Sequence, residues 1–203
     1  MDGVKSRREL YAEETRRTLV ETGRERFLEH GYLAVSAEDL VRGTGLSRGA
    51  LYHHFEGKEG LFQEVFEEQE ERAAQRIAAA MTGKDDPWEQ ALAGVDAFLD
   101  VCAERDYREL VLLQGPIALG WHRWRELDQR HLGGLLVAGI QSLIDAGVLQ
   151  DHPAELLAAA LYGGLTEISL RIADAGDPAT ARRDAGVLAR SLLEGVSRRG
   201  GTP

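Results

Sequence analysis

Cysteine is nearly absent from this sequence, since Cys102 is the only one in 203 residues. A single thiol cannot form a disulfide within the chain or a cysteine cage around a metal ion. Cys102 lies in the apolar helical stretch FLDVCAER. A small, weakly polar thiol in such a stretch is typical of a packing residue, so we expect Cys102 to be buried rather than to sense redox state.

Long apolar runs are also missing. The longest is LLAAALYGGL, Leu156–Leu165, whose ten residues are about half of what a membrane-spanning helix needs. The opening stretch, MDGVKSRRELYAEETRR, has no apolar core of the kind found in secretory signals. We therefore expect a cytoplasmic protein with no membrane partner, which agrees with the low cysteine content.

Alternating strand patterns are not found, and helical periodicity dominates the chain. Four of the five prolines stand where a helical pattern begins or breaks. The sequence therefore predicts an all-α fold. The expected helices cover about residues 8–29, 37–43, 48–54, 58–81, 87–104, 106–114, 117–145, 153–174 and 178–198.

Negative charge is unevenly distributed along the chain. Residues 1–58 contain ten Lys or Arg and ten Asp or Glu, whereas residues 59–203 contain 14 and 24. The whole net charge of -10 therefore lies after Lys58. An acidic surface repels nucleic acid, so any contact with DNA has to come from the first 58 residues.

Two short segments in that region follow one plan. VSAEDL (Val35–Leu40) and LSRGAL (Leu46–Leu51) each begin with an apolar residue and a serine and end in leucine. Ser36 and Ser47 fit the N-cap position, and the apolar ends fit hydrophobic staples. Gly45 fits the left-handed residue that ends the first helix. The pattern predicts a helix-turn-helix.

The second of these helices carries an unusual outward face. Arg48 and Tyr52 are four residues apart, and His53 and His54 follow at the exit. Arg48 can pair with guanine edges in a major groove, and the tyrosine and histidines can donate to phosphate oxygens. Lys58 adds a positive charge at the start of the next helix, which is itself a phosphate-binding position. This face predicts DNA binding.

The stretch of about residues 15–66 resembles the N-terminal DNA-binding domain of the TetR family of transcriptional regulators. Glu38 departs from the pattern, because the family commonly has a basic or polar residue there. Thr22, Gly23, Val41 and Thr44 stand where alanines are common. The positions that carry the resemblance are Phe27, Gly31, Tyr32, Ser36, Gly45, Leu46, Ser47, Leu51, Tyr52, His54, Phe55, Lys58 and Leu61.

The resemblance implies a helix-turn-helix domain over residues 1–57 and a larger helical ligand-binding and dimerisation domain over residues 58–203. It implies a homodimer on a palindromic DNA operator, and repression that an unidentified small-molecule effector relieves by moving the fourth helix. The residues expected at the DNA are Ser36, Ala37, Ser47, Arg48, Gly49, Ala50, Tyr52, His53, His54 and Lys58.

The second domain offers weaker signals, because aromatic side chains at helical spacing form core more often than pocket, and its last two helices can close the core of one chain instead of a dimer. The interruptions at Gly115, Pro116 and Gly120 open a cavity or turn a corner. The candidate pocket residues are Trp88, Phe98, Tyr107, Gln114, Trp121, His122 and Trp124. The candidate dimer residues, on two helices rich in small residues, are Leu157, Leu161, Gly164, Leu165, Ile168, Leu188 and Leu192.

Three other functions remain to be weighed. The same fold can bind a ligand or a partner without binding DNA, and a regulator of this kind can also activate transcription. An enzyme is disfavoured, because the chain has no Gly-rich phosphate loop, nucleophile motif or metal-ligand spacing. His53 and His54 point about 100° apart on a helix, so we expect no metal and no cofactor.

Overall fold

The computed structural model describes residues 6–173 and 175–198, and the elements named within them are all helices. The predicted all-α fold is confirmed. None of these described helices is long and apolar enough to cross a membrane. In chain order they are α1 (Arg7–His30), η1 (Tyr32–Ala34), α2 (Ala37–Val41), α3 (Arg48–Phe55), α4 (Lys58–Met81), α5 (Pro87–Ala103), α6 (Arg105–Tyr107), η2 (Arg108–Leu113), α7 (Gly115–Asp128), η3 (Gln129–Gly133), α8 (Gly134–Asp145), α9 (Ala154–Ala173) and α10 (Pro178–Val196).

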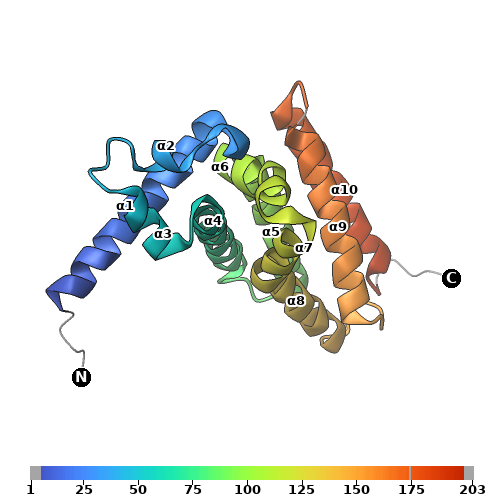
Figure 1. Ribbon diagram of the computed structural model, residues 1–203. Helices are drawn as coiled ribbons and strands as arrows, with labels where there is room; N and C mark the ends of the chain where they lie inside the picture. The colour runs from blue at the N-terminus through green and yellow to red at the C-terminus, as the bar shows by residue number, and fades with distance from the viewer. Residues whose placement is uncertain (1–5, 174, 199–203) are drawn as a thin grey trace. The chain divides into compact units, whose positions relative to one another are not determined.

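The described residues form two compact units. The first contains the chain up to Gln69 together with Glu109–Trp124, and the second contains Glu70–Arg108 together with the chain from Arg125 onward. Helices α4 and α7 therefore each begin in the first unit and end in the second (Figure 1). The domain boundary predicted between residues 57 and 58 stays a prediction.

The first unit has an aromatic cluster built from α1, η1 and α4. Helix α1 begins with a capping box between Ser6 and Glu9. The rings of Phe27 and Tyr32 each lie 5.1 Å from the ring of Phe62, centroid to centroid, in edge-on contacts. Phe27 and Phe62 are fully buried, and each such side chain contributes about 1.5–3 kcal/mol to the stability of the unit.

The junction between α3 and α4 requires a glycine. A Cβ atom on Gly60 would lie 1.7 Å from the backbone oxygen of Phe55, at the end of α3. No side chain can occupy that space without moving one of the two helices. Gly60 thus allows the first turn of α4 to pass directly against the end of α3.

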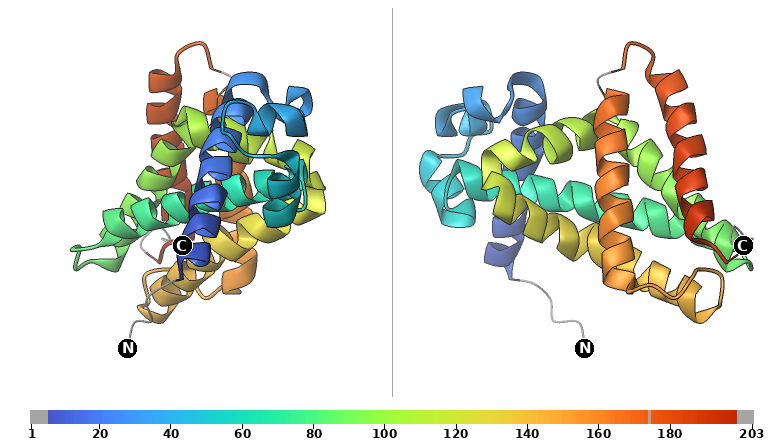
Figure 2. Two further views of the ribbon diagram at one scale, coloured as in Figure 1. Left: turned by 60° about the vertical axis from the view of Figure 1, so that its left-hand side comes forward. Right: turned by 90° about the vertical axis from the view of Figure 1, so that its right-hand side faces the viewer.

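The second unit is built from α5, α8, α9 and α10 with the last turns of α4. Helices α9 and α10 run side by side as an antiparallel pair (Figure 2). Arg182 on α10 bonds Asp100 on α5 at 2.7 Å and the backbone oxygen of Asp96 at 2.8 Å. A single antiparallel bridge between Leu149 and Ser197 closes the unit near the end of α10.

Two of the predicted helices are interrupted. The helix expected over 106–114 is divided into α6 and the wider, π-helical η2, where the backbone N–H of Gln114 reaches the oxygen of Glu109. The helix expected over 117–145 is kinked at Gly120, whose φ is 72°, and is divided again by the π-helical η3. The remaining predicted helices agree with the structure to within a few residues.

Candidate nucleic-acid interface and ligand cavity

Serine caps begin both helices of the helix-turn-helix, as predicted. The Ser36 hydroxyl accepts from the backbone N–H of Asp39 at 3.2 Å, and Asp39 returns a bond to the Ser36 N–H at 3.0 Å. The Ser36 hydroxyl also donates to the Asp39 carboxylate at 2.5 Å, and this bond, followed by the one from the Ser36 N–H, lowers the pKa of Asp39. The Ser47 hydroxyl accepts from the backbone N–H of Ala50 at 3.2 Å and opens α3.

The turn between the helices differs slightly from the prediction. Helix α2 ends at Val41, with Arg42 as its cap, so Gly45 does not end it. Gly45 does adopt the predicted left-handed backbone, with φ of 74°, further along the turn. Thr44 fixes the turn by donating to the Val41 oxygen at 2.8 Å and accepting from the Leu46 N–H at 3.1 Å.

Helix α3 buries one face and exposes the other. Leu51 and Phe55 are buried within the first unit. Tyr52 is 51% exposed, and Arg48 and His53 are exposed beside it. The outward face therefore carries the cationic and hydrogen-bonding groups that the sequence analysis assigned to DNA.

An acidic side chain lies next to the predicted base reader. The Glu38 carboxylate on α2 lies 3.8 Å from the Arg48 guanidinium, and both side chains are more than half exposed. An ion pair this exposed contributes about 0–1 kcal/mol to stability, so it does not lock Arg48 in place. It does place a negative charge beside the group expected to read guanine.

His54 differs from its neighbour His53 in its surroundings. It is only partly exposed, and its burial, followed by the charges of His53 and Arg16, lowers the pKa of its imidazole. At neutral pH this favours the uncharged ring. His54 would then offer phosphate an N–H donor rather than a positive charge.

Lys58 has partners within the protein. Its ammonium group donates to the backbone oxygens of Tyr32 at 3.0 Å and Val35 at 2.9 Å. It also lies 4.1 Å from the centre of the Tyr32 ring, in a cation–π contact. Lys58 thus fixes the chain that leads into α2, and its predicted role as a phosphate ligand stays a prediction.

Further contacts that sequence reasoning missed hold α1 in the first unit. Arg16 on α1 makes a two-pronged ion pair with Glu64 on α4, with N–O distances of 2.6 and 2.5 Å. The buried amide of Gln114 accepts from the Tyr32 N–H at 2.8 Å and donates to the Phe27 oxygen at 3.1 Å. These bonds join positions far apart in the sequence, and no local pattern marks them.

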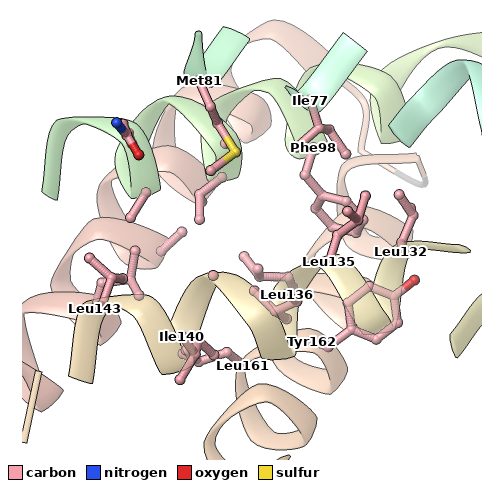
Figure 3. A pocket seen from close by; sticks show the side chains of 18 of the residues that line it. Ile77, Met81, Phe98, Leu132, Leu135, Leu136, Ile140, Leu143, Leu161 and Tyr162 are labelled. Carbon is pink, nitrogen blue, oxygen red and sulfur yellow. The ribbon is translucent and has the colours of Figure 1, made fainter. Parts of the chain in front are cut away.

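A cavity of about 250 Å³ lies inside the second unit (Figure 3). Its wall includes Ile77 and Met81 from α4, Phe98 from α5 and Tyr162 from α9. Helix α8 adds Leu135, Leu136, Ile140 and Leu143. Among the described residues that line it, none carries an ionisable acidic or basic side chain. The space suits a compact, mostly apolar molecule.

Only one of the seven predicted pocket residues, Phe98, lines this cavity. Trp88 packs beside it against the cluster around Ile140 and Leu143. In the first unit, Gln114 is a structural brace, and the buried indole of Trp124 donates to the Val111 oxygen at 2.9 Å. Trp121 and His122 are exposed in the same unit, and Tyr107 is buried in the second.

Tyr162, which lines the cavity, also belongs to a buried cluster of two acids and two tyrosines. Tyr107 donates to Glu70 at 2.9 Å, and the Tyr162 hydroxyl donates to the Asp128 carboxylate. Burial raises the pKa of Asp128 to about 6 and raises that of Glu70 well above its usual value, to which the nearby Asp128 charge adds. The cluster joins α4, α6, α7 and α9 within the second unit.

The predicted dimer residues divide between the inside and the outside of the second unit. Leu165 is buried and lines the cavity, whereas Leu157, Leu161, Gly164 and Ile168 are half-buried. Leu188 and Leu192 are exposed on α10, although Leu192 also lines the cavity. Large exposed neighbours that the prediction omitted are Leu156, at 70%, and Val187, at 68%.

Two family models match the chain. One, described as "Bacterial regulatory proteins, tetR family", covers residues 19–65. The other, described as "Tetracyclin repressor-like, C-terminal domain", covers residues 88–196, which is more than half of the chain.

Individual proteins match over most of the chain as well. A TetR-family transcriptional regulator from Pectobacterium atrosepticum is 32% identical, with a TM-score of 0.80 over 96% of this chain and 98% of that one. The Transposon Tn10 TetC protein of Escherichia coli is 24% identical over 159 residues, 77% of this chain and 79% of TetC. RolR in complex with resorcinol shares the fold, with 21% identity and a TM-score of 0.67 over 91% of this chain and 95% of RolR.

Proposed function

The chain belongs to the TetR family of bacterial regulatory proteins, and from this premise we propose that it is a repressor that binds a palindromic operator as a homodimer and releases it when a small molecule binds. Family membership makes it a DNA-binding transcriptional regulator rather than an enzyme. The dimer, the palindrome, the repression and the effector are the proposed part.

The observation that carries the proposal is the outward face of α3. Arg48, Tyr52 and His53 are exposed on a helix whose opposite face is anchored by buried Leu51 and Phe55. A rigidly held helix with these groups outward can enter a major groove, where Arg48 would read guanine and Tyr52 and His53 would hold phosphates. Ser36, Ala37 and Ser47 lie at the helix starts, where backbone N–H groups also favour phosphate.

Exposed apolar side chains support the homodimer. Leu156 on α9 and Val187, Leu188 and Leu192 on α10 are all exposed on adjacent helices of the second unit. Single chains rarely leave a group of such side chains in water, and burying them against a second copy removes that exposure. A two-fold dimer would hold its recognition helices about 34–36 Å apart, the spacing of successive major grooves.

The route of α4 supports the response to a ligand. Ile77 and Met81, near its end, line the cavity, while its first turns belong to the unit that contains α3. A ligand that fits the cavity better in one position of α4 would favour that position, and the operator would be released if α3 no longer fitted. RolR, which shares the fold, binds resorcinol.

Selection of bound duplexes from a random DNA pool tests the first half of the proposal. Purified protein, unfolded and refolded to remove any retained ligand, is expected to enrich a palindromic motif at physiological salt. Enrichment of a motif without two-fold symmetry would contradict the dimeric reader, and no enrichment by a folded sample would contradict operator binding.

Light scattering after size exclusion tests the dimer directly. Leu188→Glu places a charge in the exposed apolar group on α10, and we expect it to halve the measured mass. Leu33→Glu makes the same change at an exposed leucine of η1, and we expect it to leave the mass unchanged. A dimer that tolerates Leu188→Glu would show that the contact lies elsewhere.

A further inference from the structure

We propose that the cavity in the second unit binds an uncharged, largely hydrophobic molecule of roughly the size of a two-ring aromatic, with a hydrogen-bond donor that meets the side-chain oxygen of Gln90. The inference rests on the proposed ligand response, because it names the chemical class of the effector. Three observations support it: the side chains that line the cavity, the volume of the cavity, and the hydrogen bonds that its few polar groups already make.

The lining favours a ligand without charge. Apart from Gln90, Ser142 and Tyr162, the described residues that line the cavity have apolar side chains or are glycines. An ionised ligand would have to leave water without a counter-ion in the wall, which strongly disfavours its binding. The acids Glu70 and Asp128 are not among the lining residues, and both are buried and bonded to tyrosines.

The polar groups in the wall leave few hydrogen bonds for a ligand. The Tyr162 hydroxyl already donates to Asp128, so the cavity meets the tyrosine mainly through its ring. The Gln90 amide nitrogen donates to the Lys84 backbone oxygen at 2.6 Å. Its Oε1 has no donor among the described residues and is the acceptor left for a ligand hydroxyl or amine. Ser142 lies on an exposed position of α8.

The volume sets the scale of the ligand. A dry apolar cavity of about 150 Å³ takes benzene, so 250 Å³ corresponds to roughly ten non-hydrogen atoms. The naphthalene ring system matches this scale, so naphthalenes with one small substituent are suitable probes.

Three naphthalene derivatives of similar shape but different charge test whether the cavity prefers a neutral ligand. 1-Naphthalenemethanol is neutral, 1-naphthoate is an anion, and 1-naphthalenemethylamine is a cation at pH 7. Calorimetric titration of the full-length protein is expected to show the alcohol binding at least about tenfold more tightly than either ion, the ratio given by about 1.4 kcal/mol. An ion that binds as tightly as the alcohol would overturn the proposal, and so would binding of none of the three.

A substitution that fills the cavity tests whether the probe binds there. Gly139 lines the cavity on α8, and a Cβ atom there would meet nothing within 4 Å, so Gly139→Leu can fill the space without disturbing the helix. We expect it to weaken binding of the alcohol at least tenfold. Ala138→Leu adds bulk to an exposed neighbour on the same helix and should leave binding unchanged. Equal binding by the two variants would place the probe elsewhere and overturn the proposal.

A substitution at Gln90 tests the proposed hydrogen bond between the ligand and its side-chain oxygen. Gln90→Leu should weaken binding of 1-naphthalenemethanol several-fold but not that of 1-methylnaphthalene, which has no donor. An equal loss for both probes would remove Gln90 as the acceptor. Operator affinity is measured separately on the same samples. Probe binding that leaves operator affinity unchanged would uphold the ligand class and contradict the ligand-responsive function.

Discussion

Replacing Lys58 with methionine tests whether this side chain braces the first unit or binds DNA. Methionine keeps most of the length and apolar character of the lysine but removes the ammonium group. In the structure that group bonds the backbone oxygens of Tyr32 and Val35 and lies over the Tyr32 ring. The substitution therefore removes three interactions at once and leaves the surrounding chain otherwise unaltered.

The expected loss follows from those contacts. A hydrogen bond to a charged group contributes about 1.5–3 kcal/mol when well buried, and Lys58 is only half-buried. Allowing for water at the site, the two bonds and the ring contact together contribute about 2–4 kcal/mol to the free energy of unfolding. A phosphate ligand would behave differently, because its loss lowers the slope of log affinity against log salt by about 0.9.

Two measurements distinguish these outcomes. Urea unfolding gives the change in stability, and fluorescence anisotropy with a labelled operator at several salt concentrations gives the slope. Lys84→Met, at an exposed lysine of the second unit, provides the matched control. Unchanged stability together with a slope lowered by about one would refute the brace and establish Lys58 as a phosphate ligand.

Three further predictions concern the DNA face and the buried acids. Arg48→Ala should reduce preference at one base pair by about 1–3 kcal/mol in a competition assay over operator variants, whereas equal weakening on every sequence would mean that Arg48 holds phosphate. Glu38→Gln should tighten binding to all DNA sequences by up to about 1 kcal/mol, because it removes a carboxylate that lies 3.8 Å from the Arg48 guanidinium. Fluorescence anisotropy with random-sequence DNA measures this affinity, and weaker binding by the variant would contradict the prediction. Burial raises the pKa of Asp128 from 3.8 to about 6. Protonation of Asp128 therefore adds about 3 kcal/mol to the free energy of unfolding below about pH 4, and this contribution is lost as the pH rises through 6. Urea unfolding between pH 4 and 7 should show that fall in the natural chain and a smaller fall in Asp128→Asn, where buried Glu70, whose pKa is also raised, still titrates. The same fall in both would assign it to another group.

Local features were predictable from the sequence. Ser36 and Ser47 cap their helices as predicted, because capping is decided by the residues within one turn. The bounds of most helices were predictable for the same reason. The comparisons confirm the fold class and the prediction of a DNA-binding regulator. The π-helical segments η2 and η3 were missed, because a wider turn depends on packing and has no periodicity of its own.

Contacts between distant residues were not predictable. Lys58 and Gln114 both reach Tyr32, and no spacing rule connects positions 26 and 82 residues apart. The pocket prediction chose mainly Trp, Phe and Tyr side chains, together with Gln114 and His122, whereas the cavity is lined mainly by aliphatic ones. Aromatic rings such as that of Trp124 fill space well and so become core, and a cavity remains where smaller side chains fail to meet.

The aliphatic wall of the cavity also bears on how such a protein changes over evolutionary time. Exchanges among leucine, isoleucine and methionine in a packed interior usually cost less than about 1.5 kcal/mol, so positions such as Leu132, Leu136 and Ile140 can vary without loss of the fold. Each exchange reshapes the space while α3, in the other unit, keeps its sequence. A lineage could therefore acquire a new signal molecule and keep its operator, and a laboratory could retune the protein as a biosensor by the same substitutions.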